Sequence, residues 1–319
     1  MRQLLALFIT ACACAGASAQ AWPTKPVRLV VPYPPGGNVD AAARIVSGEL
    51  QKELGQPVVV ENRAGAGGMI AGEFVAKSEP DGHTLFFTAN GPLLYSPVIY
   101  GRNLYHWKTN FVPIASVTFT PLILQAHPSL PVKNVPELIA LAKSKPNGLS
   151  MASPGAGTTN HLMSEMLQRT TGAQWTTVHY KGNAPATNDL LAGQVQFNFD
   201  QVSVAQQFVK AGRTRALAVV APKRVPWLPE VPTLQEQGIK GIEGQTFTGV
   251  LAPAGTPPAV VERVSQAMRK ALDQTAVKAR IFAAGSDARW MSPREFADYL
   301  QKEESTWLPI IKSKNITAD

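Results

Sequence analysis

Cysteine is almost missing from this 319-residue chain, which contains only Cys12 and Cys14. Both lie within the first 21 residues, a segment that we predict to be removed on export. The rest of the chain then has no cysteine at all. We therefore expect no disulfide, no cysteine nucleophile and no thiolate metal site in the mature protein.

Long hydrophobic runs are also missing. The apolar stretch from Leu4 to Ala17 is shorter than the ~18 to 20 residues that a membrane-spanning helix needs. It follows Arg2 and precedes two overlapping Ala-x-Ala cleavage patterns within 17–21. We predict that residues 1–21 are a signal peptide and that the protein is periplasmic. Ile9–Cys12 loosely resembles a lipoprotein cleavage site, but the apolar run before it is short.

Blocks of like charge are absent, although 30 lysines and arginines exceed 22 aspartates and glutamates and give a formal charge of +8. Scattered basic residues without interleaved aromatic residues argue against nucleic-acid binding. Two interpretations remain, an ordinary basic surface or a field that attracts anionic ligands. The 45% of hydrophobic residues is typical of a globular protein with a substantial core.

The most informative stretch is 30–44, VVPYPPGGNVDAAAR. A β-branched run ends at Pro32, a Pro/Gly-rich turn follows, and an amphipathic helix is predicted to begin between Asn38 and Asp40. Glycine lets a ligand approach the backbone, and the free N–H groups of a helix start favour an anion. The stretch therefore predicts a strand, an anion-binding turn and a helix. The alternative is an ordinary βα loop without a ligand.

Strands and helices alternate along the chain, with one βα pattern over 27–88 and a similar one over 135–220. This alternation predicts an α/β protein with two mostly parallel sheets flanked by helices. Residues 89–113 are expected to be irregular. A strand is expected on each side of Pro121, which should interrupt them.

Two helices are expected to end the chain, at 258–272 and 293–311, and to cover the first sheet. Domain 1 is therefore predicted to be discontinuous. We predict that it comprises 22–119 plus 246–319 and that domain 2 comprises 120–245.

A second Gly-rich turn, Ser153–Asn160, lies between a predicted strand and helix of the second sheet. Because ligands bind beyond the carboxyl ends of strands in such sheets, the two turns would face each other across a cleft. Backbone N–H groups and hydroxyls would then hold a dicarboxylate from both sides.

Other functional motifs are absent or incomplete in the sequence. No metal-binding spacing of histidines, phosphate loop or dinucleotide fingerprint is present. Ser153 and His161 could form a nucleophile and base of a hydrolase, but no G-x-S-x-G surrounds the serine. Asp40, Asp189 and Asp200 could form a scattered acid set, and Asp200 could either line the cleft or cap the following segment.

The mature chain resembles the Bug proteins, the extracytoplasmic receptors of tripartite tricarboxylate transporters, over about 22–310. The matching motifs are WPTKPVR at 22–28, VPYPPGG at 31–37, LGQPVVVENR at 54–63, GAGG at 65–68, PDG at 80–82, YKG at 180–182, GQV at 193–195, VPT at 231–233 and APAGTP at 252–257. Phe247 stands where the family often has tryptophan, so the rim of the cleft there could differ.

The resemblance implies a two-lobed periplasmic binding protein (type II) that closes on a small carboxylate, with the cleft between the lobes. The ligand would be a di- or tricarboxylate or an aromatic acid, and transporter membrane subunits would be transient partners. We expect a monomer with no cofactor, no metal and no enzymatic activity; a sensory receptor of the same fold, docking on a kinase, is the main alternative. The predicted ligand-binding residues are Tyr33, Pro35, Gly36, Gly37, Asn38, Asp40, Asn90, Ser153, Gly155, Gly157, Thr158, Thr159, Asn160 and Asp200.

Overall fold

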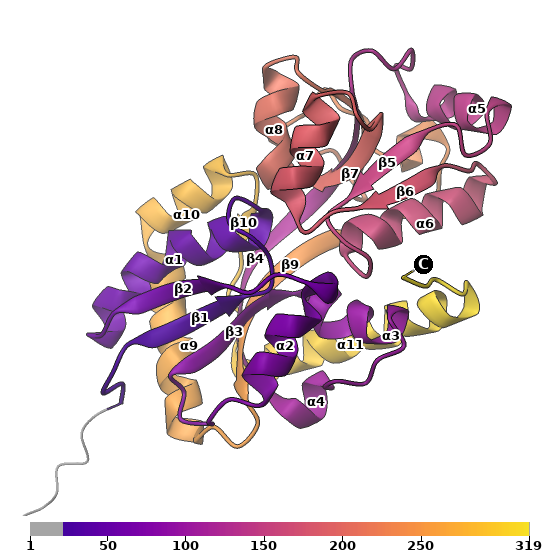
Figure 1. The fold of residues 1–319 in the computed structure, drawn as a ribbon. Helices are drawn as coiled ribbons and strands as arrows, with labels where there is room; N and C mark the ends of the chain where they lie inside the picture. The colour runs from indigo at the N-terminus through magenta and orange to yellow at the C-terminus, as the bar shows by residue number, and fades with distance from the viewer. Residues whose placement is uncertain (1–21, 319) are drawn as a thin grey trace, which may run out of the picture.

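The computed structural model describes residues 22–318, so the predicted signal peptide and both cysteines lie outside the described residues. The strands form one connected sheet, and the long strand β4 (Phe111–Ala126) belongs to two groups of strands (Figure 1). We call these groups, with their helices, the first half and the second half. Within 22–318, no helix is both long and apolar enough to cross a membrane.

The first half has the strand order β2-β1-β3-β9-β4, and β10 pairs with the free edge of β4. β1 pairs in parallel with β2 and β3, whereas β9 runs antiparallel to β3 and β4. Runs of β-branched and aromatic residues form the inner strands because both of their faces are covered. The strands are β1 (Val27–Val31), β2 (Val58–Asn62), β3 (Thr84–Ala89), β9 (Gln245–Pro253) and β10 (Asp287–Ala288).

The second half has the order β6-β5-β7-β4, and β8 pairs with the other edge of β4. β5 pairs in parallel with β6 and β7, and β4 runs antiparallel to β7 and β8. The parallel strands of each half therefore end near the same region, which is where the two Gly-rich turns begin. The strands are β5 (Ser150–Ser153), β6 (Thr176–His179), β7 (Phe197–Gln201) and β8 (Arg215–Val220).

Helices lie on both sides of each half (Figure 1). Both predicted C-terminal helices pack on the first half, since α9 contacts α1 and β4, and α11 contacts β4. α10 and β10, which lie between them, were not predicted. The helices are α1 (Asn38–Leu54), α2 (Met69–Ala76), α5 (Val135–Ser144), α6 (Thr159–Thr171), α7 (Asn183–Leu191), α8 (Val202–Lys210), α9 (Pro258–Asp273), α10 (Thr275–Ala283) and α11 (Pro293–Ser313), with short 3₁₀ turns η1 (Ala66–Gly68) and η3 (Gln235–Gln237).

The expectation that 89–113 is irregular is wrong. The segment contains a π-helical turn, η2 (Gly91–Tyr95), and two short helices, α3 (Ser96–Ile99) and α4 (Trp107–Asn110). Four of its aromatic residues, Tyr95, Tyr105, Trp107 and Phe111, are buried in the core. Buried backbone needs hydrogen-bond partners, and short helical turns supply them.

The expected interruption at Pro121 is also wrong, because β4 continues through it. Pro121 is opposite Gln245 of β9, whereas the next residue, Leu122, is opposite residues of β7 and β8. Proline lacks the N–H that a ladder requires. Here it occupies the position where β4 changes partners, so the strand can pass from the first half to the second.

Candidate functional site

The first Gly-rich turn, residues 33–38, connects β1 to α1 and forms what we call the first corner. Gly36 has a φ of +90°, a conformation that favours glycine, and its N–H donates to Asp40 Oδ2 over 3.0 Å. Arg44 Nε and Asn62 Nδ2 also donate to the Asp40 carboxylate. Burial alone would raise the pKa of Asp40, but these hydrogen bonds outweigh it and hold the pKa below its usual value. The carboxylate therefore stabilises the corner itself.

The second corner, residues 153–160, connects β5 to α6. Thr158 caps the helix, accepting a hydrogen bond from the His161 N–H at 3.3 Å, and the Gly157 N–H donates to His161 Nδ1 at 3.2 Å. Burial, with smaller effects from the neighbouring His179 and Arg169, lowers the pKa of His161 to about 3, so its ring is neutral and can accept this bond. His161 thereby fixes the shape of the corner.

Ser153 and His161 are not joined as a nucleophile and base. The Ser153 hydroxyl donates to the Gly155 carbonyl at 3.0 Å, and His161 Nδ1 is used by Gly157. Both side chains have local partners that stabilise the second corner.

A third corner, residues 180–184, connects β6 to α7 and was missed as a candidate site. The Gly182 N–H donates to the Pro154 carbonyl, which ties this corner to the second. The first α7 residue, Asn183, donates through Nδ2 to Asp200 Oδ1 at 2.6 Å and to Gln201 Oε1 at 2.7 Å. The signal was present in the sequence, because Tyr180-Lys181-Gly182 stands between a strand and a helix as in the other two corners.

The three corners bring the first residues of α1, α6 and α7 around one small cavity. Its volume is about 10 Å³, which is room for about one water molecule. No charged side chain is among its described lining residues. They are Tyr33, Asn38, Val39, Ala89, Gly91, Pro154, Thr158, Thr159, Asn160, Asn183, Gln201 and Thr246.

The backbone around this cavity has unused hydrogen-bond donors. The first N–H groups of a helix have no acceptor within the helix. At Asn38, Thr159 and Asn183, the backbone N–H donates to no other group in the described part of the chain. Three helix starts with their partial positive charge therefore meet at one point.

The side chain of Asn38 has a buried hydrogen-bond donor that a ligand could satisfy. Its side-chain Oδ1 accepts hydrogen bonds from Thr120 Oγ1 at 3.1 Å and Ser203 Oγ at 2.8 Å. Its Nδ2 is buried and has no partner among residues 22–318. An unpaired buried donor costs free energy, which an acceptor atom in the cavity would recover.

The structure separates the predicted site residues into two groups. Tyr33, Asn38, Thr158, Thr159 and Asn160 line the cavity, whereas Pro35, Gly36, Gly37, Asp40, Asn90, Ser153, Gly155, Gly157 and Asp200 are not among its lining residues. Asn90 accepts a hydrogen bond from Thr159 Oγ1 at 3.0 Å, and Asp200 lies behind Asn183. Burial raises the pKa of Asp200 to about 6, although four hydrogen bonds partly offset this effect. Seven lining residues were missed: Val39, Ala89, Gly91, Pro154, Asn183, Gln201 and Thr246.

A second chamber of about 180 Å³ adjoins the first, since Tyr33 and Pro154 line both. It lies between the glycine loop 65–68 of the first half and residues of the second and third corners. Tyr100, Tyr180 and Lys181 line it as well. Lys181 is exposed and forms no ion pair within residues 22–318.

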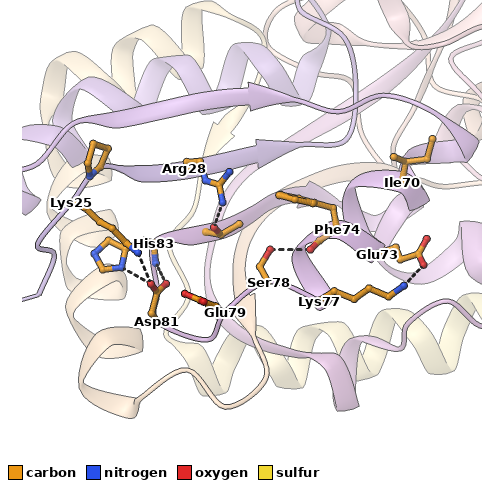
Figure 2. Close-up of a pocket in the computed structure, with 12 residues that line it drawn as sticks. Lys25, Arg28, Ile70, Glu73, Phe74, Lys77, Ser78, Glu79, Asp81 and His83 are labelled. Carbon is orange, nitrogen blue, oxygen red and sulfur yellow. Dashed lines mark hydrogen bonds and ion pairs between the residues drawn. The ribbon is translucent and has the colours of Figure 1, made fainter.

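A larger cavity of about 730 Å³ lies elsewhere, against β1, α2 and β3 (Figure 2). Its polar side chains largely bond to one another, as Lys25 does with Asp81, Glu73 with Lys77, and Arg28 with Thr84. No residue of the three corners lines it. We therefore place the candidate site at the corners.

In the described chain, no group of three or more His, Cys, Asp or Glu side chains could hold a metal ion.

The chain is similar to known proteins over most of its length. Residues 42–316 match the model of the tripartite tricarboxylate transporter family receptor. The chain is 37% identical over 316 residues to a protein encoded in the tcbD-tcbE intergenic region of Pseudomonas sp. (strain P51), which covers 99% of this chain and 94% of that one. It is 34% identical to protein BugT of Bordetella pertussis, over 98% and 97% of the two chains.

Solved structures are similar over almost the whole chain. The periplasmic binding protein BugD matches with a TM-score of 0.86 and 33% identity, over 93% of this chain and 99% of that one. R. palustris Rpa4515 with adipate matches with a TM-score of 0.89 and 33% identity, over 93% and 99%. MatC from Rhodopseudomonas palustris with bound malate matches with a TM-score of 0.87 and 33% identity, over 91% and 100%. These similarities confirm the fold expected from the sequence.

Proposed function

We propose that this chain, which belongs to the tripartite tricarboxylate transporter receptor family, is a periplasmic solute-binding protein for a small carboxylate. Its relative BugT of Bordetella pertussis is a Bug protein. The chain would deliver its ligand, a di- or tricarboxylate or an aromatic acid, to the membrane subunits of a tripartite tricarboxylate transporter. The single observation that carries the proposal is the meeting of three helix starts at an uncharged cavity with a free Asn38 amide.

The corners suit a carboxylate because they offer hydrogen-bond donors, although no lysine or arginine side chain lines the small cavity. Backbone N–H groups at helix starts bind anions through hydrogen bonds and through the helix dipole. Each hydrogen bond to a charged group contributes roughly 1.5–3 kcal/mol. In this proposal Asn38, Thr159 and Asn183 donate to the carboxylate, whereas Asp40, His161 and Asp200 position those donors.

The proposed binding cycle requires two lobes that move. A cavity of about 10 Å³ cannot admit a dicarboxylate from solution, so the lobes would separate and close again around it. We propose 22–119 plus 246–319 as one lobe and 120–245 as the other. The hinge would then lie where the chain crosses between them, at Pro121 and between β8 and β9. We further propose a monomer, exported by cleavage of residues 1–21.

The adipate and malate bound by similar proteins make linear dicarboxylates the first ligands to test. We expect the melting temperature of the purified mature protein to rise with at least one acid from a panel of mono-, di- and tricarboxylates and aromatic acids, since a ligand that binds only the folded state stabilises it. Calorimetry would then give the affinity. If no acid in the panel changes the melting temperature, the proposal fails.

Delivery to a transporter needs its own experiment. Membrane vesicles that contain the transporter subunits should accumulate the labelled acid only when the loaded protein is added. Accumulation that does not depend on the protein would contradict a receptor role, even if the acid binds.

A further inference from the structure

A different cavity, of about 480 Å³, lies at the crossings between the two halves. Pro121 of β4 lines it, as do residues 220–227 after β8 and 243–245 before β9. In the first half β10 pairs with the edge of β4 opposite β9, and in the second half β8 pairs with the edge opposite β7. Thr159 lines both this hinge cavity and the small cavity at the three corners, so the two adjoin, but they share no other lining residue.

Three aromatic side chains are among its lining residues: Tyr95, Trp227 and Trp307. The rings of Tyr95 and Trp307 pack edge to face, with centroids 6.3 Å apart and planes inclined by 62°. The faces of such rings carry partial negative charge and attract cations. Tyr95 is fully buried and its hydroxyl donates to Glu303 Oε2 at 3.1 Å, which fixes the carboxylate beside the rings.

The charges of the hinge cavity have the opposite sign to those of the whole protein. Three carboxylates line it, Glu243, Asp287 and Glu303, and none of them pairs with a basic side chain in the described structure. Of its two basic residues, Arg224 is paired with Glu236 outside the cavity, whereas Lys223 is exposed and forms no ion pair within residues 22–318, so three acids face one free lysine. The chain as a whole has a formal charge of +8. Unpaired acids next to aromatic faces thus give a local preference for cations.

We propose that the hinge cavity binds a small organic cation, an alkylammonium or quaternary ammonium compound, with Glu303 as its counter-ion and Tyr95, Trp227 and Trp307 as its aromatic walls. The volume suits such a ligand. A cation bound there contacts both crossings of the chain. The inference does not depend on the carboxylate function and extends beyond it.

Choline is a suitable probe, and 3,3-dimethylbutan-1-ol is its uncharged isostere. We expect calorimetry, at constant chloride concentration and without any carboxylate ligand, to show saturable choline binding accompanied by a change in tryptophan fluorescence. The alcohol should bind at least about tenfold more weakly, a difference of 1.4 kcal/mol. Equal binding of the alcohol, or no saturable choline binding up to about 10 mM, overturns the proposal.

Two variants locate the site. Glu303→Gln keeps the shape and an acceptor for the Tyr95 hydroxyl but removes the charge, so choline affinity should fall about tenfold or more. Trp307→Leu should also lower it, and serves as the second test if Glu303→Gln does not fold. Asp298→Asn removes the same charge from an exposed position of α11 that does not line the cavity, and should leave binding unchanged. Unchanged affinity in both Glu303→Gln and Trp307→Leu would refute the site.

Discussion

Gly91, the first residue of η2, and Gly157 in the second corner lie close together across the two halves. A Cβ atom on Gly91 would lie 2.9 Å from the Gly157 carbonyl oxygen, closer than real Cβ atoms come, and 3.1 Å from Thr158 Cα, which is a tight contact. At Gly37 an added Cβ would lie 2.9 Å from Oδ1 of the Asn183 side chain, in the third corner. Glycine at these positions lets the corners approach closely enough to share one cavity.

We predict that Gly91→Ala folds normally but cannot close. The φ of Gly91 is not in the left-handed region, so alanine causes no backbone strain, and the clash arises only with the other half. Affinity for the carboxylate should fall about tenfold or more. Small-angle scattering should show that the acid makes the wild type more compact but not the variant. Gly48→Ala is the control, because nothing lies within 4 Å of its added Cβ. Normal compaction of Gly91→Ala would contradict the prediction.

Asn38 should contribute directly to binding. Asn38→Ala removes the unpaired Nδ2 donor and should weaken carboxylate binding about ten- to hundredfold, the cost of a hydrogen bond to a charged group. Asn38→Asp, which keeps an acceptor for Thr120 and Ser203 but repels an anion, should weaken it further. Calorimetry measures both. Asn188→Ala, at an exposed position of α7, is the matched control. An Asn38→Asp protein that binds as tightly as the wild type would show that the amide does not face the ligand.

Lys181 should distinguish dicarboxylates from monocarboxylates. It lines the outer chamber, so a second carboxylate extending from the inner cavity would approach it. Lys181→Met should lower the affinity for adipate about two- to fivefold, the range of an exposed ion pair, and leave that for hexanoate unchanged. Lys143→Met, on α5, controls for net charge. Equal losses for the two acids would place the second carboxylate elsewhere.

Asp200 should make stability depend on pH. Burial raises its pKa in the folded protein to about 6, from the 3.8 of an unperturbed aspartate. Between about pH 4 and pH 6 the folded state holds a proton that the unfolded state has lost, so stability falls as the pH rises, by up to about 3 kcal/mol, and then stays level. Urea unfolding should show this as a decrease in the stability of the wild type relative to Asp200→Asn across the window. A difference that is flat or grows with pH would contradict the pKa shift.

Local signals were sufficient for the corners that the sequence predicted. The β-branched run before Pro32, the glycines at 36 and 37 and the periodic helix after Asn38 depend on neighbouring residues only, and the structure has that strand, turn and helix. Gly55 follows the last residue of this helix in the left-handed conformation that glycine favours. The second corner follows the same logic.

Features that depend on distant contacts were not predictable in this way. Gln201 and Thr246 come from separate segments outside the three corners, and only the fold brings them to the cavity. The bond from the Gly36 N–H to Asp40 shows why a residue type alone does not give a role, since this carboxylate stabilises the corner. Pro121 suggested a break in a strand, because the change of partners that accommodates it is a property of the whole sheet.

The most direct test of the central claim is a crystal structure of the protein with the acid that gives the largest melting shift. We expect one carboxylate of the ligand at the junction of α1, α6 and α7, with its oxygens within about 3.2 Å of the backbone N–H groups and of Asn38 Nδ2. A ligand that is held at another place in the molecule, with the three helix starts making no contact to it, would contradict the account.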